Sequence, residues 1–453
     1  MIRDPASFRD PAGRVFYRSG AVYRAINESY AEDYQFLIES GLHQSLSEDR
    51  LVVDHVPAES SLDANAHAVI EPTRIPFVSY PYEWSFHQLK DAAKTVLQVQ
   101  RRAIAFGMTL KDGSAYNIQF LDNRPIWIDT LSFERCDDCR PWIAYRQFCR
   151  HFLAPIAMMS LIDLRLGTMS KQYLDGIPLD LASSLLPSKL SKPGLQLHIH
   201  MHAKADRQSA ASAQPGQAKN VSRAGHLALL ESLEGTIDGL KPRNRSTEWG
   251  DYENRHRYSP TAWEDKASIV EALLLIAKPD TVWDLGANAG RFSRIAAGLG
   301  ASVVAWDLDP EAVDQHYLAL RERPDSSILP LVVDLTNPSP ALGWALEERR
   351  SFLQRGPVDA VIALAVIHHL AIGNQVPFDM IADFFARLGR WLIIEFVPRE
   401  DPQVQRLLRG RTEEFSWYGE EALERALLGR FERVERRPIT DSGRVITLWK
   451  RQS

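Results

Sequence analysis

The clearest hydrophobic pattern in the chain lies between residues 281 and 308. The apolar run Thr281–Leu285 has the composition of a buried parallel strand. Apolar residues then recur at helical spacing through Arg291–Leu299, and Ser302–Trp306 forms a second apolar run. The pattern predicts a strand, a turn, a helix and another strand, which is the repeating unit of a doubly wound α/β sheet.

The same alternation continues to the end of the chain. Two further helices are expected, at Pro310–Arg321 and Phe378–Leu388. The other expected strands are Ile328–Val333, Asp359–Ala365, Trp391–Val397, Phe431–Arg436 and Arg444–Lys450. Together they predict a seven-stranded Rossmann-like sheet whose last two strands are antiparallel. A ligand cleft is expected at the carboxyl ends of its parallel strands.

Glycines and polar residues mark the turn after the first of these strands. Gly286 and Gly290 allow a tight turn and a close approach of the backbone to a ligand. Asn288 tolerates a positive φ better than most residues do. Asp307 ends the next strand about twenty residues beyond Gly286, the spacing expected between a nucleoside-binding turn and the carboxylate that binds its ribose.

The segments DLGANAG and VVAWDLDPEAV resemble motifs I and II of the class I S-adenosylmethionine (SAM) methyltransferases. The resemblance covers roughly Trp249–Lys450 and implies SAM as the cofactor. In many of these enzymes an aromatic segment before motif I covers the cofactor, which implies such a role for Tyr258 and Lys266. The full set of cofactor-binding residues that the resemblance implies is Asp284, Gly286, Asn288, Gly290, Asp307, Leu308, Asp334, Leu335, Leu364, Tyr258 and Lys266. An inert or nicotinamide-binding layer is the alternative.

Three residues are candidates for a catalytic base. The segment Val366–Leu370 follows the fourth expected strand and resembles the motif IV region of small-molecule methyltransferases. It contains His368 and His369, and histidine titrates near neutral pH. Glu395, near the end of the fifth strand, is a further candidate. A base is needed only when the acceptor starts protonated, as an alcohol does, and a purely structural role for both histidines is the alternative.

The first two hundred residues follow a different pattern. Two β-rich runs around Ser19 and Gly20 predict a hairpin over Arg14–Ile26, and Ser85–Gly107 has the apolar stripe of an amphipathic helix. We expect an α+β domain over residues 1–203 and a linker over 204–224, where Ala, Ser and Gln dominate. The methyltransferase domain is expected over residues 225–453.

A segment of this first domain resembles a second family. Residues 110–133 contain Asp112, Asn117 at the fifth place after it, and Asp129 beyond a predicted hairpin. They resemble the catalytic-loop and metal-binding segments of protein-kinase-like phosphotransferases, in which such residues supply a base and hold magnesium. Because a glycine-rich loop and a strand lysine are missing upstream, the resemblance implies at most a degenerate kinase-like fold. A polar hairpin with Asx turns is the alternative.

Cysteine and histidine give weaker signals. Cys136 and Cys139 have the spacing of half a zinc site, but Cys149 and His151 lie two residues apart in an expected helix, so no metal site is predicted. His198 alternates with two further histidines in LHIHMHA, which favours a half-exposed strand.

Composition and net charge limit the classes of function that are expected for this chain. The chain has 453 residues, 45% of them hydrophobic, and a net charge of -5. An acidic chain does not supply the phosphate attraction that dominates nucleic-acid affinity. We find no apolar run long enough for a membrane span and no signal-peptide core at the start. The sequence therefore predicts a cytoplasmic SAM-dependent methyltransferase acting on a small-molecule, glycan or protein acceptor. The alternative is a kinase-like or pseudokinase scaffold with a SAM-binding regulatory domain.

Overall fold

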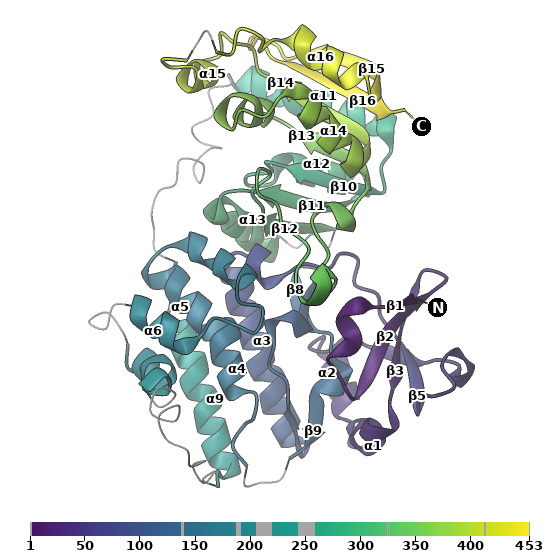
Figure 1. Cartoon of the computed structure of the whole chain (residues 1–453), viewed down its shortest axis with the longest axis vertical. Helices are drawn as coiled ribbons and strands as arrows, with labels where there is room; N and C mark the ends of the chain where they lie inside the picture. The colour runs from purple at the N-terminus through teal and green to yellow at the C-terminus, as the bar shows by residue number, and fades with distance from the viewer. Residues whose placement is uncertain are drawn as a thin grey trace. The chain divides into compact units, whose positions relative to one another are not determined.

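The chain divides into two units with separate cores (Figure 1). The computed structural model describes residues 2–136, 140–186, 192–204, 220–242, 259–323, 325, 327–411 and 414–452. The first unit comprises Met1–Arg245 together with Gly343–Glu348. The second comprises Ser246–Leu342 and Arg349–Ser453.

The first unit begins with a five-stranded sheet in the order β1-β2-β3-β5-β4. Its strands are β1 (Ile2–Arg3), β2 (Gly13–Arg18), β3 (Ala21–Ile26), β4 (His55–Pro57) and β5 (Ala68–Pro72). Ser19 and Gly20 have φ values of 50° and 84°. Two consecutive residues with positive φ form the tight turn that suits the twist of a hairpin. The predicted β2–β3 hairpin is therefore present.

Helix α3 (Phe86–Ala105) is the longest helix of the first unit. The Ser85 side chain accepts a hydrogen bond from the Gln88 backbone, and the Gln88 side chain accepts one from the Ser85 backbone at 2.9 Å. This capping box satisfies two amides that helix geometry leaves unpaired. The predicted apolar stripe is buried, with Leu89, Ala92, Val96 and Leu97 at most 1% exposed.

The first unit contains further helices and strands. Its other helices are α1 (Ala31–Glu39), α2 (Leu42–Glu48), α4 (Tyr145–Phe148), α5 (Ala154–Leu161), α6 (Leu179–Leu185), α7 (Pro193–Leu195) and α9 (Arg223–Asp238). Its other strands form two antiparallel pairs, β6 (Met108–Leu110) with β9 (Phe133–Arg135) and β7 (Ile118–Leu121) with β8 (Arg124–Trp127).

Helix α9 belongs to the first unit, whereas the sequence analysis began the methyltransferase domain at residue 225. Its polar side chains pair with α3: Arg101 lies 2.8 Å from Glu234, and Lys90 donates to the Asp238 carbonyl at 3.1 Å. Its apolar residues Leu230, Leu233 and Ile237 are buried. These long-range contacts decide where the helix belongs, and the local sequence does not carry them. Most of the expected linker lies outside the described residues.

The expected strand around His198 is wrong, because Gln196–Met201 forms a π-helical turn. His198 is buried there, with Nδ1 2.7 Å from the Tyr145 hydroxyl and Nε2 2.9 Å from the Ser232 hydroxyl. Burial raises the pKa of the neighbouring Cys149 to about 12, so this thiol stays protonated at neutral pH. Cys139 lies outside the described residues.

The second unit contains a seven-stranded sheet in the order β12-β11-β10-β13-β14-β16-β15 (Figure 1). Its strands are β10 (Thr281–Leu285), β11 (Ser302–Asp307), β12 (Ile328–Val332), β13 (Val358–Ala363), β14 (Gly389–Phe396), β15 (Phe431–Pro438) and β16 (Val445–Arg451). The first five are parallel, and β16 is antiparallel to both β14 and β15. The predicted seven-stranded Rossmann-like sheet is confirmed.

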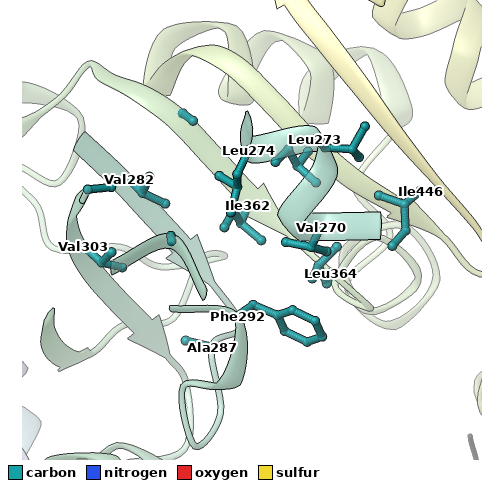
Figure 2. Packing of buried hydrophobic residues seen from close by; sticks show 14 of the residues in the cluster. Val270, Leu273, Leu274, Val282, Ala287, Phe292, Val303, Ile362, Leu364 and Ile446 are labelled. Carbon is teal, nitrogen blue, oxygen red and sulfur yellow. The ribbon is translucent and has the colours of Figure 1, made fainter. Parts of the chain in front are cut away.

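Helices cover both faces of this sheet. They are α11 (Pro260–Ala277), α12 (Arg291–Gly298), α13 (Pro310–Glu322), α14 (Phe378–Leu388), α15 (Pro402–Leu407) and α16 (Glu420–Leu428). Figure 2 shows α11 residues Val270, Leu273 and Leu274 gathered with Ile362 of β13 and Ile446 of β16 in one buried cluster. Since side chains alternate along a strand, neighbouring positions face the opposite layer.

That opposite layer is aromatic. The ring centroids of Trp283 and Trp306 lie 5.6 Å apart, and the Phe352 ring lies 4.7 Å and 5.1 Å from them. All three side chains are at most 1% exposed. Buried side chains thus pack against both faces of the central strands β10 and β11. This packing holds the turns at the carboxyl ends of the two strands in place. In the part of the chain that the structure describes, no helix is both long and apolar enough to cross a bilayer.

Candidate functional site

A cavity of about 250 Å³ lies along the carboxyl ends of the parallel strands in the second unit. The turns after β10, β11, β12 and β13 contribute its floor, and α11, α15 and the start of β16 contribute further wall. Residues that line it include Trp263, Lys266, Gly286, Asn288, Arg291, Phe292, Asp307, Leu308, Asp334, Leu335, Leu364, His368, His369, Asn374, Gln403 and Arg444. This is the place where open α/β sheets bind ligands.

The turn after β10 depends on glycine. Gly286 has a φ of 80°, and a Cβ at this position would lie 2.6 Å from Cγ2 of Val366. Gly290 has a φ of 81°, and its Cβ would lie 2.0 Å from the His316 ring. Asn288 adopts a φ of 49° between them. Both glycines are therefore required by conformation and by space, and the turn lies against the cavity through Gly286 and Asn288.

Asp307 closes this turn from the end of β11. Its carboxylate accepts the backbone N–H of Asn288 at 2.8 Å and that of Asp309 at 2.9 Å. Burial raises the pKa of Asp307 to about 6, although these two hydrogen bonds oppose the shift. The carboxylate is therefore ionised at neutral pH, held by backbone amides, and in contact with the cavity.

Asp284 and Gly290 hold the turn after β10 in shape. Neither belongs to the cavity lining that the described residues form. Asp284 is 2% exposed and accepts a hydrogen bond from the Ser293 hydroxyl at 2.6 Å. This contact ties β10 to the first turn of α12. Burial raises the pKa of Asp284 to about 6, and Asp307 contributes to the rise.

The turn after β12 forms one end of the cavity. Asp334 accepts the Thr336 backbone N–H at 2.8 Å and the Thr336 hydroxyl at 2.6 Å. Leu335 of the same turn, Leu308 after β11 and Leu364 after β13 add apolar surface to the cavity lining. An apolar slot of such side chains with a carboxylate in the same lining has the chemistry needed to hold a purine and accept its exocyclic amine.

A buried ion network forms the opposite end. Lys266 of α11 lies 2.7 Å from Glu395 of β14, with side-chain exposures of 2% and 0%. Arg444 contacts Glu395 at 3.2 Å and Asp401 at 2.9 Å. Glu395, expected as a possible base, lies behind the cavity wall and bridges two cations. Its observed contacts position Lys266 and Arg444.

His368 and His369 follow β13 and line the cavity. The backbone before them is strained, because Ala365 has a φ of 54°. The two rings lie 4.2 Å apart, and His368 is 2% exposed. Its Nδ1 atom is buried and has no hydrogen-bond partner among the described residues. Burial, His369 and the cations Arg444 and Lys266 hold the pKa of His368 well below its usual range.

The structure therefore brings the two histidines and most of the implied cofactor-binding residues to one cavity. Tyr258 lies outside the described residues. Sequence reasoning missed several lining residues, namely Trp263, Arg291, Phe292, Asn374, Gln403 and Arg444. For Trp263 the aromatic segment before motif I was a usable signal. Gln403 and Arg444 gave none, because they come from α15 and from the segment before β16, more than thirty residues apart.

The kinase-like residues of the first unit have different surroundings. Asp129 pairs with Arg24 at 2.6 Å, and the same guanidinium lies 2.8 Å from Asp10. Burial raises the pKa of Asp129, Arg24 opposes the rise, and Asp10 and Asp112 add to it. Asp112 caps the turn that leads to Asn117 by accepting the Ser114 backbone N–H at 2.9 Å. A guanidinium thus lies against the carboxylate expected to hold a metal.

One known protein matches almost the entire chain. Nodulation protein NoeA of Rhizobium meliloti (strain 1021) is 35% identical over 460 residues, which cover 99% of this chain and 96% of NoeA. The chain belongs to the NoeA family. Both units are part of this NoeA match, so the two-unit organisation lies within the shared sequence. No protein-family model matches the sequence.

Solved structures match less than half of the NoeA-family chain. The N-methyltransferase NodS from Bradyrhizobium japonicum WM9, in complex with S-adenosyl-L-homocysteine (SAH), is 15% identical, with a TM-score of 0.33, over 44% of this chain and 91% of NodS. Magnesium protoporphyrin IX methyltransferase from Synechocystis PCC 6803 with bound SAH is 19% identical, with a TM-score of 0.31, over 46% of this chain and 90% of that enzyme. Likeness at this level carries no argument about activity.

Proposed function

We propose that the second unit is a SAM-dependent methyltransferase. One observation carries the proposal: the Asp307 carboxylate and the Gly286–Asn288 turn meet at the carboxyl ends of β10 and β11, in contact with the same cavity. A carboxylate held by backbone amides is fixed to accept two ribose hydroxyls. The apolar slot with Asp334 at its edge fits an adenine.

Bound SAM supplies an electrophilic methyl group on a sulfonium. The residues of this chain bind the nucleoside through Asp307 and Asp334 and keep the opposite end of the cavity polar through Lys266 and Arg444. Trp263 and Phe292 place aromatic rings beside Lys266, with centroids 5.7 Å and 5.0 Å from its Nζ atom. Orientation and exclusion of water are the principal contributions that such a site makes to a direct displacement.

We infer an acceptor other than nucleic acid, with oxygen as the methylated atom. The candidate acceptors are a small molecule, a glycan or a protein segment. His368 or His369 as general base stays a prediction. The lowered pKa of His368 keeps it neutral at pH 7, and it also makes this imidazole a weak base.

For the first unit we propose a degenerate kinase-like role without phosphotransfer. The Arg24–Asp129 ion pair supports this, because a fixed cation competes with a metal for the carboxylate. The rival function is a scaffold whose second unit only binds SAM.

Thermal shift and turnover together test these proposals. We expect SAM and SAH to raise the unfolding temperature of the full chain, because ligands that bind only the folded state stabilise it. ATP with magnesium is expected to leave it unchanged. A shift with ATP and magnesium alone would favour the scaffold, and a SAM shift without methylation of any fraction of a cell extract would contradict the enzyme.

A further inference from the structure

Charge is unevenly distributed along the cavity. The lining carboxylate Asp307 ends β11 and Asp334 follows β12, whereas the cation Arg444 precedes β16. Four strand-to-strand steps separate β11 from β16 in the sheet order, roughly 19 Å at the usual spacing of about 4.8 Å. Lys266 lies toward the basic end, since its ammonium bonds Glu395 of β14. A third lining cation, Arg291, begins α12 beside the β10 turn and pairs with Glu264 at 2.8 Å. The nucleoside carboxylates and the pair of cations Arg444 and Lys266 therefore occupy opposite ends.

Two ion pairs hold the Arg444 side chain in place at the basic end of the cavity. Arg444 has only 7% of its side chain exposed, and its Nε and Nη1 atoms are fixed by Asp401 and Glu395. Both carboxylates approach from behind, while Arg444 itself lines the cavity. Gln403 also lines the cavity and carries an amide that can donate a hydrogen bond, whereas the Asn374 amide already donates to the His369 carbonyl at 2.9 Å. A guanidinium held this way is suited to a planar anion.

We propose that the methyl acceptor is a carboxylate, bound at the Arg444 end of the cavity, and that the reaction forms a methyl ester. This proposal rests on the proposed function and specifies its substrate class. His368 contributes an independent observation, since it is 2% exposed with an unpartnered Nδ1 beside the same wall. A neutral imidazole can donate one hydrogen bond to a carboxylate oxygen.

The chemistry needs no base. A lone pair on the carboxylate oxygen forms the new bond to the methyl carbon while the carbon–sulfur bond breaks and leaves its electron pair on sulfur. No proton is transferred, and the products are an ester and a thioether. The anion and the sulfonium cancel as they react, so a water-poor cavity opposes charge separation and favours this displacement.

Other acceptors fit this end of the cavity less well. A protonated amine would meet Lys266 and Arg444, whose partner carboxylates Glu395 and Asp401 are not among the lining residues, and it would have to lose a proton before it could attack. An alcohol needs a base, and the nearest imidazole, His368, has a strongly lowered pKa. A carboxylate is already nucleophilic and complements the cations.

Three matched probes test the charge preference on the full-length protein saturated with SAH. Benzoate, benzamide and benzylamine share one ring and differ in charge, and their affinities can be measured by ligand-observed NMR. We expect benzoate to bind at least tenfold more tightly than either of the others. Equal affinities, a preference for benzylamine, or no binding by benzoate would each overturn the proposal.

Variants locate the site. Arg444→Gln should remove the benzoate preference and leave SAH affinity within about threefold. Because Arg444→Gln leaves Asp401 without its ion-pair partner, the double variant Arg444→Gln with Asp401→Asn restores the charge balance and should behave alike. Arg436→Gln is the matched control, since Arg436 of β15 pairs with Glu420 of α16 and lies outside the cavity lining. Retained preference in both Arg444 variants would refute the assignment.

A second measurement examines the product itself. Label transferred from methyl-tritiated SAM to small acids of a cell extract should be released by mild alkali as volatile methanol. Alkali-stable label would indicate an ether or an amine and overturn the proposal. Failure of SAH to bind the wild-type protein would instead refute the proposed function, so the two failures are distinguishable.

Discussion

Asp307 ends a strand of the second unit, Asp129 follows a strand of the first, and burial raises the pKa of each. Their partners differ. Asp307 accepts the backbone amides of Asn288 and Asp309 and lies in a cavity lining. Asp129 also accepts a backbone amide, that of Leu131 at 3.1 Å, but it is paired in addition with Arg24 at 2.6 Å. Amides fix a carboxylate and leave its charge available to a ligand. A guanidinium neutralises that charge from within the protein.

The comparison shows why a motif alone does not establish a site. Asp307 was predicted from its spacing from Gly286, and Asp129 from its position after a predicted hairpin. The cation that separates them, Arg24, comes from β3, more than a hundred residues before Asp129. Five predictions test this difference between the two units.

The largest effect is expected from Gly286→Val. A side chain at this position meets Val366 and cannot adopt a φ of 80° without strain, so SAM binding should fall below detection by calorimetry. Gly300→Ala is the matched control: its φ is 96°, but no atom lies within 4 Å of the added Cβ. It should cost stability by about 1 kcal/mol and leave affinity intact. Normal affinity in Gly286→Val would contradict the cofactor site.

Asp307→Ala is expected to weaken SAM about a hundredfold. Two charge-assisted hydrogen bonds to the ribose are lost, each worth about 1.5 kcal/mol or more. The domain should stay folded, which circular dichroism can verify. A loss below threefold would show that another group, such as the Asp309 carboxylate, holds the ribose.

The pH dependence of Asp307 sharpens this test. Its pKa is raised to about 6 from an ordinary value near 4, so the folded protein holds the proton longer than the unfolded chain. The contribution of Asp307 to stability is therefore fully present below pH 4 and is lost as the pH rises through 6. SAM affinity should change in the opposite sense, rising up to about pH 6 and flat above pH 7. Asp307→Asn should flatten this profile; an unchanged profile would assign it to Asp284.

Arg24→Ala tests whether the ion pair with Arg24 occupies the Asp129 carboxylate of the first unit. Removing one partner of a buried pair leaves an uncompensated charge, and because Arg24 and Asp129 are 12% and 14% exposed we expect a loss of about 2 kcal/mol. Denaturant unfolding of the full chain measures it. Arg50→Ala is the control, since Arg50 and Asp122 are 47% and 39% exposed and should contribute less than about 1 kcal/mol. ATP turnover in the wild type that disappears in Asp129→Ala would contradict the closed site.

The smallest effect is expected from His368→Ala. If the acceptor is already an anion, loss of this imidazole should lower kcat less than about tenfold, whereas loss of a general base usually costs about 10²–10⁴-fold. His369→Ala is the companion variant, and both are measured with SAM binding as the reference. A hundredfold loss of kcat at unchanged SAM affinity would restore the sequence prediction of a base.

Much of the second unit was readable from the sequence because its signals are local. The apolar runs, the glycines of the β10 turn and Asp307 lie within thirty residues, and the structure brings Gly286, Asn288 and Asp307 together as expected.

The rest depended on contacts between distant residues. Arg444 reaches the cavity because β16 runs antiparallel beside β14, which places its start next to Phe396. Glu395 was predicted as a possible base, but in the structure it forms ion pairs with Lys266 of α11 and with Arg444 before β16. Both partners are distant from Glu395 in the sequence. The alternating histidines around His198 suggested a strand, and burial against Tyr145 and Ser232 fixed a helix instead.

The proposed cofactor site is tested by calorimetric titration of SAH into the full-length protein, with Asp307→Ala and Asp129→Ala measured in parallel. We expect one SAH site per chain, weakened about a hundredfold by Asp307→Ala and unchanged by Asp129→Ala. Absence of SAH binding to the wild type, or equal affinity in the wild type and Asp307→Ala, would contradict it.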